Sequence, residues 1–140
     1  PRMSRGRDRN ERDSLCSGCQ RVIELGEIRA AAERIAGYVH RTPLLSAASI
    51  GERAGVRLFL KCESFQKTGS FKPRGALNKV LSLSAEERAK GLVTVSAGNH
   101  AQAVAWAAAC VGVPCVVVMP TAAPRSDIMT ARAATAATSS

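Results

Sequence analysis

The chain has 140 residues, of which 46% are hydrophobic, and its formal net charge at pH 7 is +9. This length suits one small domain or part of a larger one, and the absence of any run of about 18 apolar residues excludes an obvious transmembrane helix. Only 4% of the residues are aromatic and no long Lys/Arg run is present, so the basic charge predicts a solvated surface and a small anionic ligand rather than a nucleic-acid or membrane partner.

Residues 1–21 are polar, rich in arginine and without periodicity, which predicts a disordered basic extension. This extension contains a CxxC pair, Cys16 and Cys19. A structural zinc site would need a second pair of ligands, and neither the other cysteines nor the two histidines have that spacing. We therefore expect no metal site, with metal binding at the CxxC pair as the minor alternative, and reduced thiols in a cytoplasmic protein.

The pattern changes after residue 21. Apolar residues recur at helical spacing over residues 28–39, which predicts a helix. The next segment, RTPLL at 41–45, contains a proline and predicts an extended conformation. Residues 46–55, SAASIGERAG, predict a short helix that ends at Gly55.

From residue 56 onward, short apolar segments alternate with helix-sized ones. We predict strands at 56–62, 92–96 and 114–119 and helices at 74–83, 84–91 and 100–111. The second of these helices opens on a capping box, with Ser84 at the N-cap and Glu87 three residues later. This alternation is typical of an α/β fold in which helices cover a parallel sheet, and ligands then bind beyond the carboxyl ends of the strands.

Two polar, glycine-containing loops lead from a predicted strand into a helix, and we expect them to form the walls of one site. The first, SFQKTGSFK at 64–72, ends on Lys72 in the first helical turn, with Ser70 expected at the N-cap. A cation is disfavoured there and the neighbouring Arg74 adds like charge, so the placement favours the neutral, nucleophilic amine. From the loop pattern alone, the alternative is that Lys72 is an ordinary exposed lysine. Asn99, in the second loop, has a similar alternative, because asparagine tolerates the left-handed backbone of a turn.

Three segments carry a resemblance to a known family: RIAGYVHRTPLL (34–45), KCESFQKTGSFKPRGA (61–76) and SAGNHAQAVAWAA (96–108). In order and spacing they resemble the threonine dehydratase and serine racemase family, which are pyridoxal-phosphate enzymes of the tryptophan-synthase β-like fold, or fold type II. The resemblance covers about 22–126. It implies that residues 22–55 are the N-terminal arm of a large domain and that residues 56–126 are a small α/β domain carrying the cofactor lysine.

The resemblance also assigns roles to particular residues. It implies that Lys72 forms a Schiff base with pyridoxal 5′-phosphate, that Asn99 hydrogen-bonds the 3′-hydroxyl of the cofactor, and that Phe71 packs near its ring. A second set resembles the loop whose backbone amides hold the substrate carboxylate, which fits the affinity of a helix N-terminus for anions. This set is Ser96, Ala97, Gly98, Asn99 and His100.

The substrate implied by the resemblance is a small hydroxy amino acid, threonine or serine. The family's dehydratases remove the α-proton, eliminate the β-hydroxyl and release a 2-oxo acid and ammonia, with the freed lysine as the expected proton carrier on one face. Family racemases place a second acid–base serine between the positions of Ser96 and Gly98, where this chain has Ala97. Because a methyl group moves no proton, we expect a threonine ammonia-lyase, with a serine racemase-like enzyme as the alternative. The full-length form is expected to be a homo-oligomer.

Two parts of the family pattern are absent from the chain: the glycine-rich loop for the cofactor phosphate and the residue that contacts the pyridine nitrogen. We therefore expect an N-terminal fragment that is inactive alone. Residues 127–140 depart from the family pattern and predict an aberrant or disordered tail, which a displaced reading frame would explain. A stand-alone binding or regulatory module derived from the same domain is the second hypothesis, and a nucleic-acid-binding protein that uses residues 1–21 is the third.

Overall fold

The computed structural model describes residues 22–126. The basic extension predicted at 1–21, with its CxxC pair, and the tail predicted at 127–140 therefore lie outside the described residues. The described elements are, in chain order, α1 (Leu25–Arg34), β1 (Leu44–Ser46), α2 (Ala48–Ala54), β2 (Phe59–Lys61), the 3₁₀ turns η1 (Glu63–Phe65) and η2 (Lys67–Gly69), α3 (Lys72–Ser82), α4 (Ala85–Ala89), β3 (Leu92–Val95), α5 (Asn99–Cys110) and β4 (Cys115–Val118). This mixture is the α/β class that the sequence predicts.

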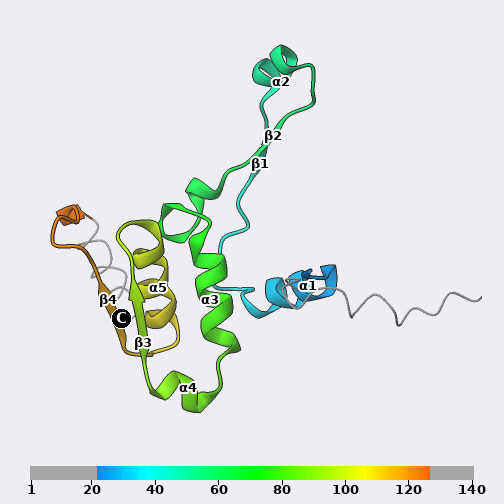
Figure 1. Cartoon of the computed structure of the whole chain (residues 1–140). Helices are drawn as coiled ribbons and strands as arrows, with labels where there is room; N and C mark the ends of the chain where they lie inside the picture. Colours follow the sequence, from blue (N-terminus) through cyan, green and yellow to red (C-terminus); the bar gives the residue numbers. More distant parts are fainter. Residues whose placement is uncertain (1–21, 127–140) are drawn as a thin grey trace, which may run out of the picture.

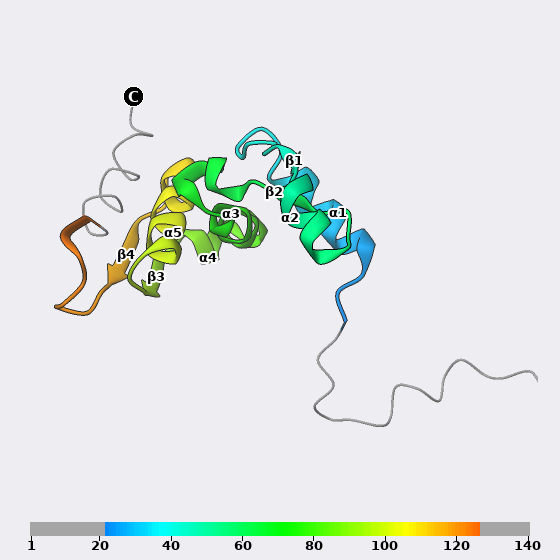
Figure 2. The same ribbon diagram turned by 90° about the horizontal axis from the view of Figure 1, so that it is seen from above.

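Helices α3 and α5 pack side by side, and α5 also lies against β3 and β4 (Figure 1). The two strands run parallel, in the register Leu92 with Cys115 through Val95 with Val118. Seen from above, α5 lies between α3 and β4 (Figure 2). Small side chains permit this close approach on both sides of α5, since its buried residues are all alanines: Ala101, Ala103, Ala105, Ala107 and Ala108.

One hydrophobic core joins these helices to the segment that follows α1. Leu77 and Val80 of α3 meet Ala107 of α5 and Ile35. The largest fully buried side chains are Leu77 and, in the first turn of α3, Pro73. The core cluster therefore holds α3 from Leu77 onward, while Pro73 is buried in the first turn, next to the candidate lysine.

The strand predicted at 56–62 forms, as β2, but its predicted place in the parallel sheet is wrong. It pairs antiparallel with β1, from Leu44 opposite Lys61 to Ser46 opposite Phe59, and α2 closes the far end of this lobe (Figure 1). The proline-containing segment predicted as extended supplies the partner strand, and a neighbour so near in sequence pairs at a lower entropic cost than a distant strand. Among the described residues, the parallel sheet is the pair β3–β4.

Local signals at the helix ends are mostly confirmed. α1 is shorter than the periodicity over 28–39 predicts, because the chain turns tightly after it, with Gly37 at φ 84°. α2 ends at Gly55 in the left-handed conformation, as expected. The capping box of α4 is present, since the Glu87 backbone N–H donates to Ser84 Oγ (3.2 Å) and the Ser84 N–H donates to Glu87 Oε2 (2.8 Å).

No helix within residues 22–126 is long and apolar enough to cross a membrane. The same range holds no group of three or more His, Cys, Asp or Glu side chains that could bind a metal ion. Its cysteines, Cys62, Cys110 and Cys115, are free thiols. Burial raises the pKa of Cys110 and Cys115, which keeps both thiols protonated at neutral pH and so unreactive.

Candidate active site

Lys72 is the first residue of α3, with Phe71 at the N-cap and Pro73 in the following position. Its side chain is exposed, and its Nζ lies 5.0 Å from the centroid of the Phe71 ring. Within residues 22–126 this amine has neither a hydrogen-bond partner nor an ion-pair partner. The lysine is thus an unpaired amine at the exposed edge of a helix start that Pro73 anchors in the interior.

The predicted N-cap role of Ser70 is wrong. Ser70 has an extended backbone (φ −154°, ψ 167°) and precedes the N-cap residue, Phe71. The chain reaches it through two consecutive left-handed residues, Thr68 (φ 59°) and Gly69 (φ 67°), a strained conformation for a β-branched side chain. Ser70 is only 8% exposed and its Oγ has no hydrogen-bond partner in the part of the chain that the structure describes. Its hydroxyl is therefore buried instead of lying over the helix start.

The second predicted loop, at 96–100, connects β3 to α5. Gly98 is the N-cap residue of α5 and has φ 85° and ψ −147°, a conformation that glycine adopts far more readily than other residues. Asn99 is the first helical residue and, like His100, is exposed. Because the left-handed residue is Gly98, a turn conformation does not explain the asparagine. The first backbone N–H groups of α5 have no partner within the helix, so this end of α5 suits an anion.

The two loops lie at the same end of the helix pair. α3 and α5 run side by side with their first turns at the upper end of Figure 1, and η2, in the first loop, packs against α5. A groove between α3, β3 and α5 is lined by Gly75 and Ala76 from the beginning of α3 and by His100 from the beginning of α5. His100 lines this groove, whereas Lys72, Phe71 and Asn99 do not. That the two loops form the walls of one site is still a prediction, as are the roles of single residues.

Arg74 is held by an ion pair rather than free beside the lysine. Its Nε donates to Glu63 Oε2 and its Nη2 donates to Glu63 Oε1, both at 2.8 Å. Nη2 also lies within hydrogen-bonding distance of the His40 carbonyl oxygen (3.0 Å) and of Thr42 Oγ1 (3.4 Å), and the Thr42 hydroxyl donates to Glu63 Oε1 (2.5 Å). The expectation that Arg74 adds like charge beside Lys72 is therefore wrong, because Glu63 neutralises it.

The ion pair remains charged over the whole neutral range. The hydrogen bonds from Arg74 lower the pKa of Glu63 from its ordinary value of 4.5 to about 2, against the opposing effect of burial and with help from the Thr42 hydroxyl. In return, the Glu63 carboxylate raises the pKa of Arg74.

Gln66 makes a second link between the loop and residues 40–42. Its side-chain Oε1 accepts hydrogen bonds from the backbone N–H groups of His40 and Lys67, both at 2.9 Å, and its Nε2 donates to the His40 carbonyl oxygen at 2.8 Å. Gln66 is 4% exposed. Nearby, Lys61 Nζ donates to the Thr42 carbonyl oxygen (2.6 Å). The segment that leads to Lys72 is thus tied to residues 40–42 at several points.

The sequence motifs do not indicate the roles of Glu63, Gln66 and Thr42 in these contacts. The one available signal is that Glu63 is the single acidic residue of 56–74, a segment that is otherwise basic. An isolated carboxylate among cations points to an ion pair, but the sequence does not say which cation it binds.

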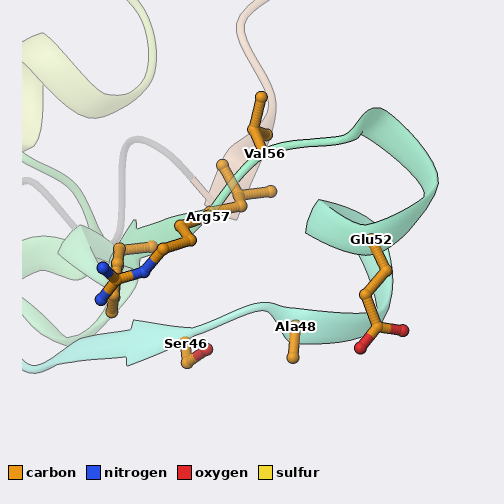
Figure 3. A pocket seen from close by; sticks show the side chains of 7 residues that line it. Ser46, Ala48, Glu52, Val56 and Arg57 are labelled. Carbon is orange, nitrogen blue, oxygen red and sulfur yellow. The ribbon is translucent and has the colours of Figure 1, made fainter.

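A separate hollow lies in the lobe of β1, α2 and β2 (Figure 3). Its lining residues are Ser46, Ala48, Glu52, Val56, Arg57, Leu58 and Phe59. The side chains of Arg57 and Glu52 point away from each other, and the Arg57 guanidinium lies 5.8 Å from the centroid of the Phe59 ring. None of the predicted site residues lines this hollow, so it is not part of the candidate site.

Comparisons with known proteins agree on one family. The family profile described as "Pyridoxal-phosphate dependent enzyme" matches residues 35–138. A serine racemase of Oryza sativa subsp. indica is 52% identical over 107 residues, which are 76% of this chain and 32% of the relative. An L-threonine ammonia-lyase of Thermotoga maritima is 49% identical over 111 residues, which are 79% of this chain and 28% of the relative. The crystal structure of serine racemase from Dictyostelium discoideum matches with a TM-score of 0.76 at 46% identity, covering 80% of this chain and 37% of that chain.

The chain spans about a third of the length of the curated relatives it matches. Racemase and ammonia-lyase relatives have nearly the same identity to it, 52% and 49%. Similarity alone therefore does not separate the two reactions.

Proposed function

Because this chain belongs to the pyridoxal-phosphate dependent enzyme family, in its branch of ammonia-lyases and racemases, we propose that the full-length protein is an ammonia-lyase acting on L-threonine or L-serine. Its products would be a 2-oxo acid and ammonia. The resemblance drawn from the three sequence motifs is confirmed by the family match, and so are the fold type and the cofactor class. The reaction and the substrate are our proposal.

The unpaired amine of Lys72 is the observation that carries this proposal. A primary amine is the group that reacts with the aldehyde of pyridoxal phosphate, and no partner among the described residues competes for it. The Phe71 ring beside it offers an apolar surface to a flat aromatic ligand. When bound, the cofactor withdraws electrons from the α-carbon of an amino acid. The described residues thus fit the carbonyl side of the cofactor.

We assign two tasks to Lys72: it would hold the cofactor, and its Nζ would take the α-proton of the substrate and return a proton to the departing hydroxyl. The amide of Asn99 would donate to or accept from the ring hydroxyl of the cofactor. The first backbone N–H groups of α5, at Asn99 and His100, would bind the substrate carboxylate, because a helix N-terminus favours anions.

Ala97 favours elimination over racemisation. Racemisation needs a second proton carrier on the side of the substrate opposite Lys72, and the methyl group of Ala97 carries no proton. The neighbouring Ser96 hydroxyl already donates to the Ala97 carbonyl oxygen at 3.1 Å. Serine racemisation is the second candidate function, favoured by the 52% identity to the rice serine racemase.

The products of the full-length protein test the proposal. The protein would be incubated with pyridoxal phosphate and L-serine or L-threonine, the 2-oxo acid would be measured by enzymatic reduction, and the amino-acid enantiomers would be separated by chiral chromatography. We expect elimination to exceed racemisation by about a hundredfold, the size of the effect of one missing acid–base group. D-serine formed as fast as pyruvate would contradict the proposal.

Two variants sharpen this experiment. Ala97→Ser is expected to raise the rate of D-serine formation, because it supplies a hydroxyl where the family's racemases have one. Lys72→Ala is expected to abolish both reactions, whereas Lys79→Ala, which removes an exposed lysine two turns further along α3, should abolish neither.

A further inference from the structure

The loop that presents Lys72 is closed at its base. This lysine loop, residues 63–74, begins just after β2 and ends in the first turn of α3. Its first and last residues, Glu63 and Arg74, are joined by two parallel hydrogen bonds of 2.8 Å. Such a paired, two-point contact fixes the relative orientation of the two side chains as well as their distance.

A second segment of the chain holds both ends of the lysine loop. Arg74 also donates to the His40 carbonyl oxygen (3.0 Å), and the Thr42 hydroxyl donates to Glu63 (2.5 Å). Inside the loop, Gln66 binds the backbone N–H and carbonyl groups of His40 through its side-chain amide. The loop is therefore fixed against residues 40–42 at its beginning, in its middle and at its end.

Little freedom is left between this contact and the backbone of Lys72. Pro73 separates Lys72 from Arg74, fixes its own φ and is fully buried. If the Arg74 guanidinium were released, the first turn of α3 would lose the contacts that limit its movement, and the Cα–Cβ bond of Lys72 moves with that turn. The direction in which the lysine side chain leaves the backbone thus depends on where Arg74 is held.

The ion pair also contributes to stability, since the side chains of Arg74 and Glu63 are only 32% and 19% exposed and the contact is a two-point Arg–carboxylate pair. Its place in the fold, however, favours a role in orientation. The core contacts that hold α3, at Leu77 and Val80, lie further along the helix. The ion pair is therefore better suited to orient the first turn than to hold the helix in place.

We propose that the Glu63–Arg74 ion pair positions the amine of Lys72 for reaction, an inference that rests on the proposed function of that lysine. Neither side chain touches the substrate in this account; both act through the orientation of the first turn of α3. Because a misplacement of about 1 Å at a reacting group costs up to about a hundredfold in rate, loosening the pair should slow chemistry at Lys72 far more than it lowers stability.

The test compares Glu63→Gln and Arg74→Lys with Arg34→Gln in the full-length protein. Arg34 is a matched control, since its Nη1 also donates to α3, at Asn78 Oδ1, but outside the lysine loop. Borohydride reduction at set times after pyridoxal phosphate is added to the apoprotein measures how fast label appears on Lys72. Thermal unfolding of the same samples measures stability.

We expect Glu63→Gln and Arg74→Lys to slow both the labelling of Lys72 and kcat by about tenfold or more, with KM changed by less than about twofold. Both variants should still unfold cooperatively, because Leu77 and Val80 hold α3 independently of the pair, and Arg34→Gln should label at the normal rate. Normal labelling in Glu63→Gln, an equal loss in Arg34→Gln, or loss of cooperative folding in both loop variants overturns the proposal. A different result, no label on Lys72 in the unsubstituted protein, overturns the proposed function and this inference with it.

Discussion

Two regions of the described chain differ in how they bury apolar side chains. Around α3 and α5, Leu77 is 0% exposed and the buried alanines of α5 are 0–3% exposed. In the lobe of β1, α2 and β2, by contrast, the exposed fractions are 62% for Leu44, 51% for Leu45, 48% for Phe59 and 47% for Leu60. The region that carries Lys72 and Asn99 thus has a core of its own, whereas the lobe leaves apolar surface for something else to cover.

The parallel strands β3 and β4 have one buried face and one exposed face. One face of β3–β4 packs against α5. The other face is open, with Val93 and Val95 each 75% exposed, Val116 58% and Val118 48%. The sheet therefore has one face in the core around α5 and one face that, like the lobe, leaves apolar side chains exposed.

Leu77→Ala should cause the largest loss of stability, because Leu77 lies in the core around α3 and α5. Truncating a fully buried leucine costs about 3 kcal/mol, because the contacts are lost and a cavity is left. Leu60→Ala is the matched variant in the lobe and should cost less than about 1 kcal/mol, since Leu60 is 47% exposed. Denaturant unfolding of the 140-residue chain, followed by circular dichroism, measures both. Equal losses would remove the distinction between the regions.

Gly51→Ala should disturb the lobe alone, by about 1–3 kcal/mol of local stability. A Cβ at Gly51 would lie 2.5 Å from the Val56 carbonyl oxygen and 3.3 Å from Leu58 Cβ, so α2 has to shift. The Val56 amide, which donates to the Gly51 carbonyl oxygen at 3.0 Å, should then exchange its hydrogen faster, while the amides of β3 and β4 keep their protection. Gly26→Ala is the control, because nothing lies within 4 Å of that Cβ position. Faster exchange in β3 and β4 as well would show that the regions open together.

The Glu63–Arg74 pair, which joins the segment just after β2 to the first turn of α3, gives the smallest expected effect, a dependence of stability on pH. The pKa of Glu63 is lowered in the folded state from 4.5 to about 2, so the stability it contributes is fully present above about pH 4.5 and is lost as the pH falls towards 2. Unfolding midpoints in urea at pH 6, 4 and 3 should therefore fall less steeply in Glu63→Gln than in the unsubstituted chain. Glu33→Gln removes one carboxylate at an exposed helix position and controls for the change in net charge.

The elements that local chemistry determines could be predicted from the sequence. The capping box of Ser84 and Glu87 marked the start of α4, Gly55 marked the end of α2, and the alanine-rich segment 100–111 became α5 to within one residue at each end. Each of these signals lies within a few residues of the feature that it predicts, so no knowledge of distant contacts was needed.

Three features that depend on distant contacts could not be predicted. The partner of β2, the burial of Ser70 and the ion pair of Glu63 all depend on which segments meet in space. Glu63 binds Arg74, 11 residues away, and Thr42, 21 residues away. A single sequence with five basic residues in 56–74 offers several partners for that carboxylate and no physical reason to choose among them. The roles given to Lys72 and Asn99 came from the family resemblance and are still predictions.

The position of the cofactor link after reduction shows whether Lys72 is the lysine that binds pyridoxal phosphate. The full-length protein would be mixed with pyridoxal phosphate, reduced with borohydride and digested, and the labelled peptide would be identified by mass spectrometry. The account predicts one pyridoxyl group on Lys72, and its loss in Lys72→Ala. A label on Lys61, Lys67 or Lys79 with none on Lys72 would contradict the account.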